Sequence, residues 1–279
     1  MAELLPGGES CHDGTVSEPS EFNPRKPRSA RLHDFWLGGK DNFAADREAG
    51  QAALDAYPDI ASSARATRAF LVRAVRYLAA EEGVRQFLDI GAGMPAAGTL
   101  NTHEVALAAA PECRVLYVDN DPEVSRHALA RLTSKDGASS YIEADVRDTD
   151  KLLDQVTYTL DLSQPVAIML IAILHFVANA EDPHGIVARL VRAAAPGSYL
   201  MVCHPAIDQH VNAPEAMTRL NRAMEQKRTL RNHYDVSRLF TGLELLPPGL
   251  VRPSQWRPDT EEEATRPSAS WVGVGRKPR

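Results

Sequence analysis

The chain has 279 residues, of which 44% are apolar, and this is enough for one large α/β domain with additions. Its net charge of −6 argues against binding to nucleic acid, and its three well-separated cysteines argue against disulfides and thiolate metal sites. The N-terminus does not resemble a signal peptide and no apolar run has bilayer length, so we expect a cytoplasmic protein that does not bind membranes.

The N-terminal part divides into a tail and a helical cap. Residues 1–28 are rich in Pro, Gly, Ser and Glu, which predicts a disordered tail, and 29–82 are expected to form the cap, with helices at Ala44–Ala56 and Ser62–Ala80. Before these helices, Gly38 and Gly39 are followed by three polar residues, Lys40, Asp41 and Asn42. Such a loop is costly to order and unhelpful to a core, so we expect it to close over a ligand.

From residue 83 to 279, apolar runs alternate with amphipathic segments. This alternation predicts one doubly wound α/β domain, a mostly parallel sheet with helices on both faces. A helical insert at about 206–234 should follow the fifth strand and cover a pocket. The expected strands are Gln86–Ile90, Val115–Asp119, Ser140–Ile142, Val166–Ile171, Tyr199–Cys203, Leu243–Leu246 and Ser270–Val274. The expected helices are Thr102–Ala110, Pro122–Leu132, Thr149–Gln155, Pro183–Ala194 and Pro214–Leu230, and Arg252–Pro267 is expected to be a loop.

The segment QFLDIGAGMP at residues 86–95 is the most informative. An apolar strand leads into Gly91-Ala92-Gly93, and glycines just past a strand end let the backbone approach a ligand closely. Ligands of open α/β sheets bind at this edge. The segment formally matches a dinucleotide fingerprint, but the next helix begins only after Asn101, where Glu104 completes a capping box. A pyrophosphate needs a closer helix N-terminus, so the loop favours a ligand without phosphate.

Acidic side chains lie at the ends of the first three strands, at Asp89, Asp119 and Asp145. Parallel strands end at one sheet edge, so these carboxylates should create a negative field there. Asp119 can accept both hydroxyls of a ribose, and Asp145 can accept the amine of an adenine that lies beside Asn120 and Val146. Such a field suits a cofactor with a sulfonium and an ammonium group, and disfavours a pyrophosphate.

This order of elements resembles class I S-adenosylmethionine (SAM) methyltransferases. Four segments are similar to one actinobacterial SAM-dependent methyltransferase family of formerly unknown function: Leu37–Arg47, Asn101–Val105, Tyr117–Pro122 and Leu174–Val177. The resemblance covers nearly everything after residue 29. It implies a Rossmann-like, seven-stranded sheet, SAM as cofactor, and methyl transfer to an unidentified acceptor, for which a small molecule is the default.

Further site residues follow from this resemblance. His175 comes after the fourth strand, where the transferable methyl should emerge. It could accept a proton from an acceptor hydroxyl or amine, or pack over the cofactor and bond to the backbone. Arg68 could pair with the SAM carboxylate. The remaining expected cofactor contacts, in addition to the glycine loop and Asp89, are Gly39, Asp41, Asn42 and His103.

Two alternatives stay open at this point. A SAM-binding sensor would carry the same cofactor residues but form no S-adenosylhomocysteine. An NAD-dependent oxidoreductase would explain the glycine pattern, although the long loop and Pro95 within it argue against this. The sequence identifies neither the acceptor, nor the atom that is methylated, nor the oligomeric state.

Overall fold

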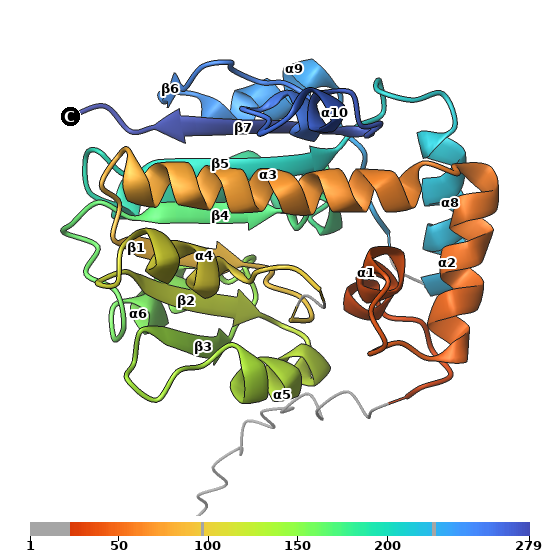
Figure 1. Ribbon diagram of the computed structural model, residues 1–279, viewed down its shortest axis with the longest axis horizontal. Helices are drawn as coiled ribbons and strands as arrows, with labels where there is room; N and C mark the ends of the chain where they lie inside the picture. The colour runs from red at the N-terminus through yellow and green to blue at the C-terminus, as the bar shows by residue number, and fades with distance from the viewer. Residues whose placement is uncertain (1–22, 96–97, 225–226) are drawn as a thin grey trace, which may run out of the picture.

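A seven-stranded sheet in the order β3-β2-β1-β4-β5-β7-β6 forms the centre of the computed structural model, which describes residues 23–95, 98–224 and 227–279 (Figure 1). Strands β1 to β5 run parallel, whereas β7 is antiparallel to both β5 and β6. The strands are β1 (Gln86–Ile90), β2 (Arg114–Asp119), β3 (Ser139–Glu143), β4 (Ala167–Ile171), β5 (Tyr199–Pro205), β6 (Glu244–Leu245) and β7 (Ser270–Arg276). The predicted fold class is confirmed, and each predicted strand is present within a few residues.

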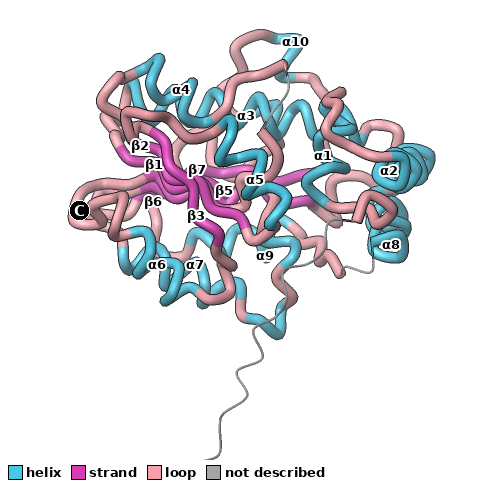
Figure 2. The backbone as a smooth tube through the Cα atoms, turned by 90° about the horizontal axis from the view of Figure 1, so that it is seen from below, coloured by secondary structure: helices cyan, strands magenta, loops and turns pink. Residues whose placement is uncertain are grey.

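Helices cover both faces of this sheet, which explains why every residue of its central strand β1 is buried (Figure 2). In β1, Phe87 packs into one hydrophobic cluster while Leu88 and Ile90 pack into the other, as the strand period of two requires. The first cluster includes residues of α3 (Ile60–Ala80), α4 (Thr102–Ala109) and α5 (Pro122–Arg131). The second includes residues of α6 (Thr149–Val156), α7 (Pro183–Ala193) and α9 (His233–Ser237).

Three further helices, α1 (Ser29–Leu37), α2 (Ala44–Ala56) and α8 (Ala213–Met224), gather beyond the carboxyl ends of the parallel strands (Figure 1). Arg31 of α1 is fully buried; its Nε lies 2.8 Å from Asp46 and its Nη1 lies 2.6 Å from Glu123 of α5. These ion pairs tie the cap to the sheet domain. Of the predicted tail, 1–22 lie outside the described residues, whereas 23–28 are held in place: the amide of Arg28 donates to Asp46 at 2.9 Å.

The segment after β6 differs from its expectation as a loop. It contains two short helices, η4 (Pro253–Gln255) and α10 (Glu261–Ala264), and it places the fully buried Trp256 against α3. Arg73 of α3 donates to the carbonyl oxygen of Trp256 at 3.0 Å, which fixes the segment. The helix expected at Pro214–Leu230 ends earlier, at Met224. The other short elements are η1 (Leu174–Phe176), η2 (Asn179–Glu181) and η3 (Arg238–Phe240).

The described residues contain neither a membrane-spanning helix nor a group of side chains placed to hold a metal ion. No helix among them combines the length and the hydropathy needed to cross a membrane. Within the same ranges, no group of three or more His, Cys, Asp and Glu side chains is placed to hold a metal ion. Cys113 and Cys203 are buried free thiols, and Cys11 lies outside the described residues.

Candidate functional site

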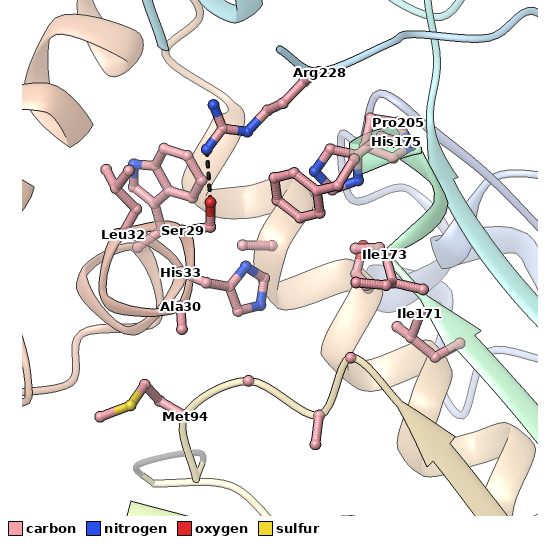
Figure 3. A pocket seen from close by; sticks show the side chains of 18 of the residues that line it. Ser29, Ala30, Leu32, His33, Met94, Ile171, Ile173, His175, Pro205 and Arg228 are labelled. Carbon is pink, nitrogen blue, oxygen red and sulfur yellow. Dashed lines mark hydrogen bonds between the residues drawn. The ribbon is translucent and has the colours of Figure 1, made fainter. Parts of the chain in front are cut away.

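A cavity of about 470 Å³ lies where the cap meets the carboxyl ends of the parallel strands. The strand order reverses between β1 and β4, and the cavity opens at this switch point, where ligands of open α/β sheets bind. Its volume is within the range of small-molecule sites. Figure 3 shows the loop with Met94 on one side, and residues of α1 such as Leu32 and His33 on another.

The glycine loop after β1 forms one wall of the cavity. Gly91 and Gly93 have φ of 79° and 65°, in the left-handed region that favours glycine. The amide of Gly91 donates to the carbonyl oxygen of Val118 at 2.8 Å, and a Cβ on Gly91 would lie 2.8 Å from Ile173. Glycine is therefore required at position 91, both for the turn and for the close approach to the chain after β4.

Asp119 ends β2 and lines the cavity. Its two carboxylate oxygens accept hydrogen bonds from the amides of Gly93 at 2.9 Å and Asp121 at 3.0 Å. Burial raises the pKa of Asp119 to about 6. A carboxylate has about four acceptor sites, so this side chain keeps capacity for the two hydroxyls of a ribose.

The third acidic strand end lies beside the second. Asn120 Nδ2 donates to Asp145 Oδ2 at 2.9 Å, and Asp145 Oδ1 accepts from both the amide and the Nε of Arg147, each at 2.9 Å. Val146 is buried next to them in the cavity lining. The structure thus brings most predicted site residues to one cavity, namely Arg68, Gly91, Ala92, Gly93, Asp119, Asn120, Asp145, Val146 and His175.

Two predicted cofactor residues lie behind the wall of the cavity and not in its lining. Asp89 is 5% exposed and accepts a hydrogen bond from Thr102 Oγ1 at 2.6 Å, and burial raises its pKa. His103 is turned to Tyr117, whose hydroxyl lies 2.8 Å from both the amide and the Nδ1 of His103. Both residues fix the start of α4, so they support the loop, and the geometry does not support direct cofactor contact by either.

The loop that includes Gly39, Asp41 and Asn42 also lies outside the lining of this cavity. Asn42 Nδ2 donates to Asp34 Oδ2 at 2.8 Å, and Asp41 Oδ2 accepts from Arg131 Nη1 of α5 at 2.7 Å. The loop therefore closes the end of α1 and borders a separate cavity of about 200 Å³. The N-terminal region contributes residues between 28 and 37 to the large cavity instead, so the predicted role of this loop in cofactor binding gains no support.

His175 lies on η1, 7% exposed, and its Nδ1 has no hydrogen-bond partner in the described residues. Burial, and the positive charge of Arg228 among its neighbours, hold the pKa of His175 well below its usual range. Its ring centroid lies 3.9 Å from that of Phe176. At neutral pH this side chain is a neutral imidazole in the cavity wall, able to accept a hydrogen bond or a proton from a ligand.

Arg231, which sequence reasoning did not single out, holds η1 in place. Its guanidinium donates to the carbonyl oxygens of Leu174 and Val177, each at 2.9 Å, and it lies 2.7 Å from His204 Nε2. His204 Nδ1 donates to the carbonyl oxygen of Pro205 at 2.8 Å, which leaves Nε2 to accept. Burial lowers the pKa of His204 to about 3, so this imidazole is neutral. No sequence spacing links residues 175, 204 and 231, because the fold alone brings them together.

Two comparisons identify the family. A family model described as S-adenosyl methyltransferase matches residues 15–278. The chain belongs to this methyltransferase family. It is 40% identical to a DUF574 family protein from Streptomyces avermitilis MA-4680, whose crystal structure has a TM-score of 0.85 over 91% of this chain and 98% of that chain. It is 36% identical to a Thermobifida fusca YX protein provisionally assigned as a methyltransferase, with a TM-score of 0.86 over 95% and 100% of the two chains.

More distant structures support the fold alone. An O-methyltransferase family protein from Burkholderia thailandensis is 13% identical, with a TM-score of 0.51 over 91% of this chain and 65% of that chain. No curated protein matches this chain. The family match and the two structures above 30% identity confirm, at the level of the family, the resemblance inferred from four sequence segments.

Membership of this methyltransferase family implies the use of SAM, and the residues of the cavity fit that cofactor. Asp119 would hold the ribose, Asn120 and Asp145 would hold the adenine, and the glycine loop and Arg68 would lie at the methionine end. Arg68 donates to the carbonyl oxygen of Leu100 and is a partly exposed cation within this lining. SAM supplies a methyl group that is already activated on a sulfonium.

Proposed function

We propose that this protein transfers the methyl group of SAM to a small-molecule acceptor bound in the same cavity. The observation that carries the proposal is the continuity of this cavity. One volume is lined by the glycine loop and Asp119 and also by His175, under the helices α1 and α8. A protein that only sensed SAM would not need space beyond the cofactor.

The chain's own residues have three tasks in this reaction. Asp119, the glycine loop and Arg68 fix the cofactor end, and the wall around His175 aligns the acceptor. Alignment is the main requirement, because holding two reactants in line removes much of the entropic barrier. The apolar side chains of α1 and α8, such as Leu32 and Leu220, exclude water from the cavity. A general base is optional in this scheme.

The size of the cavity supports a small acceptor. Its volume of about 470 Å³ must receive both the cofactor and the acceptor atom, and α8 covers it with the buried Ala213 and Ala216. Sites of this size bury most of a small ligand. The net charge of −6 also disfavours a nucleic-acid acceptor.

The first experiment compares SAM, S-adenosylhomocysteine and NAD as stabilising ligands in thermal unfolding. A ligand at a hundred times its dissociation constant adds about 2.7 kcal/mol to the free energy of unfolding. We expect this effect for SAM and S-adenosylhomocysteine, and none for NAD. Stabilisation by NAD alone would overturn the proposal in favour of an oxidoreductase.

The second experiment tests methyl transfer. The protein is incubated with methyl-labelled SAM and the small-molecule fraction of a cell extract, and labelled products and S-adenosylhomocysteine are measured. We expect both to form, and to be lost with Asp119→Ala at a limiting SAM concentration. Binding of SAM without product in any extract would identify a sensor and contradict the proposal.

A further inference from the structure

Arg228 lies in the segment between α8 and α9, and it lines the cavity at the end away from the glycine loop. In Figure 3, Arg228 and Met94 stand on opposite sides of the cavity, with His33 between them. The side chain is 8% exposed, although the sequence alone allows a solvated arginine at this position. A cation is therefore buried in the part of the cavity that the cofactor residues do not occupy.

The contacts of this guanidinium leave it incompletely satisfied. Nη2 donates to Ser29 Oγ at 2.8 Å and lies 2.7 Å from the sulfur of Met224, and the group lies 5.1 Å from the ring centre of Phe176. Nη1 is buried and has no hydrogen-bond partner among the described residues. No ion pair joins Arg228 to a carboxylate in that part of the chain.

The other buried arginines of the described ranges differ in this respect. Arg31 pairs with Asp46 and Glu123, and Arg73 pairs with Glu263 at 3.0 Å. Arg231 has no carboxylate, but both of its terminal nitrogens donate to backbone carbonyls. Among the buried arginines that the structure describes, Arg228 alone lines the cavity with a buried nitrogen that has no partner and with no ion pair to a described carboxylate. Burying a charge without a partner is costly, so such an arrangement indicates a partner that arrives with a ligand.

The neighbouring groups set the charge of that ligand. Burial lowers the pKa of Arg228 to about 10, so it stays cationic at neutral pH. The pKa of His33 is lowered to about 4, first by burial and then by Arg68, and that of His175 is also low, so both imidazoles are neutral. Arg228 is thus a cation in the lining at this end, beside two neutral imidazoles, while Arg231 lies behind η1. A carboxylate matches the charge of Arg228, whereas a phosphate monoester brings a charge of about −1.5 to −2.

We propose that the methyl acceptor carries a carboxylate that binds Arg228, on an apolar or aromatic body. A guanidinium holds a carboxylate through parallel N–H···O bonds, which fixes the orientation of the ligand. The body of the acceptor lies against apolar side chains of the same lining, Leu32, Trp36, Phe176, Met217, Leu220 and Leu230. This inference rests on the proposed function, because it names the class of the acceptor for that same site.

The test measures binding of matched acids and amides by isothermal titration in the presence of saturating S-adenosylhomocysteine. The probes are monocarboxylic acids with phenyl, hydroxyphenyl, indolyl and short aliphatic bodies, each with its primary amide, which has the same shape without the charge. We expect at least one acid to bind at least tenfold more tightly than its amide. Arg228→Gln should abolish this preference, and Arg228→Lys should keep part of it. The matched control is Arg222→Gln, an exposed arginine on α8, which should leave the preference unchanged.

Three results would overturn the inference. The first is that no acid in the panel binds more tightly than its amide. The second is that Arg228→Gln keeps the preference while its circular dichroism and melting temperature match those of the wild type. The third is that Arg228→Gln weakens S-adenosylhomocysteine binding at least tenfold, which would assign Arg228 to the cofactor.

Two further titrations of the wild-type protein separate this inference from the proposed function. One measures binding of SAM and S-adenosylhomocysteine alone, and the other measures binding of the acids and amides without either cofactor. If the wild-type protein binds neither SAM nor S-adenosylhomocysteine, the proposed function fails, and an acid preference that depends on Arg228 would still establish the anion site. If the cofactor binds and no acid is preferred, the inference fails alone.

Discussion

The carboxylate of Asp119 accepts a hydrogen bond from the amide of Gly93 at 2.9 Å. This bond joins the end of β2 to the loop after β1, so one side chain both shapes the glycine loop and lines the cavity. The second carboxylate oxygen accepts from the amide of Asp121 at 3.0 Å, just before α5 begins. The negative charge of Asp119 is therefore fixed in position before any ligand arrives, which reduces the entropy lost on binding.

Replacing Asp119 should weaken SAM binding. We expect Asp119→Ala to cost about 1–3 kcal/mol of binding free energy, because a charge-assisted hydrogen bond to the ribose is lost. Isothermal titration measures the change. Asp182→Ala is the matched control: its carboxylate caps α7 outside the cavity lining, so the substitution should cost about 1–2 kcal/mol of stability and leave SAM affinity unchanged. Wild-type affinity in Asp119→Ala would contradict the assignment.

The raised pKa of Asp119 should make stability depend on pH. Its pKa is 3.8 in the unfolded reference and about 6 in the folded protein, because of burial. Between these values the folded protein holds a proton that the unfolded chain has lost, so this group's contribution falls as pH rises. Asp119→Asn cannot ionise, so its stability relative to the wild type should rise by about 1–3 kcal/mol between about pH 4 and pH values above 6. Urea unfolding from about pH 4 to pH 8 checks this; a stability difference that is constant across the range would rule it out.

Much of this fold could be predicted because its signals are local. The run Gln86–Ile90 is mostly apolar and is followed by Gly91, and the strand has those bounds. The capping box of Asn101 and Glu104 predicted where α4 begins, and the amide of Asn101 does donate to Glu104 at 2.6 Å. Because parallel strands share one edge, the topology then brought Asp119 and Asp145 to the same cavity.

The rest depends on contacts between distant segments, which leave no periodic signal. Arg31 forms an ion pair with Glu123, which is 92 positions away in the sequence, and this contact ties α1 to α5. Arg228 is hydrogen-bonded to Ser29, which is 199 positions away in the sequence. The sequence alone therefore could not distinguish a buried Arg228 from an arginine on a solvated helix face. We expected the loop at Gly39 to close over a ligand because its residues are costly to order. In the structure these residues close the end of α1, where a Cβ on Gly39 would collide with Asp34.

The two glycines of the loop should respond differently to substitution. Gly91→Ala combines a left-handed φ of 79° with a Cβ 2.8 Å from Ile173, so we expect a loss of about 2–5 kcal/mol of stability together with weaker SAM binding. Gly93→Ala meets nothing within 4 Å and should cost about 1–2 kcal/mol from its φ of 65° alone. Denaturant unfolding measures both, and equal losses would show that the contact with Ile173 is unimportant.

Asn42 should matter for stability and not for SAM. Asn42→Ala removes hydrogen bonds to Asp34 at 2.8 Å and to the carbonyl oxygen of Gly39 at 3.0 Å, which should cost about 1–2 kcal/mol. SAM affinity should change by less than about threefold, or ~0.7 kcal/mol. Lys40→Ala, an exposed neighbour, is the control for both measurements. A tenfold loss of affinity in Asn42→Ala would show that this loop moves onto the cofactor after all.

His175 allows a sharper choice between proton transfer and positioning. A general base that removes an acceptor proton contributes about 10²–10⁴ to turnover, so in that case His175→Ala should lower kcat by this factor and leave SAM affinity intact. The low pKa of His175, caused mainly by burial, makes it a weak base, and its ring packs on Phe176 beside the cavity. We therefore expect a positioning role: SAM or acceptor affinity falls, and kcat falls by less than about 10².

The pH dependence separates this role from a merely structural one. If His175 is a general base, kcat falls at acid pH below the lowered pKa of His175 and His175→Ala loses that inflection, whereas replacing a positioning imidazole leaves the shape of the kcat profile unchanged. His175→Gln should restore part of the affinity that His175→Ala loses, because the amide can still accept a hydrogen bond. His184→Ala, on α7 outside the cavity lining, is the matched control. The SAM affinity measurements need no acceptor. Unchanged affinity and unchanged turnover in His175→Ala would contradict both the proton-transfer role and the positioning role.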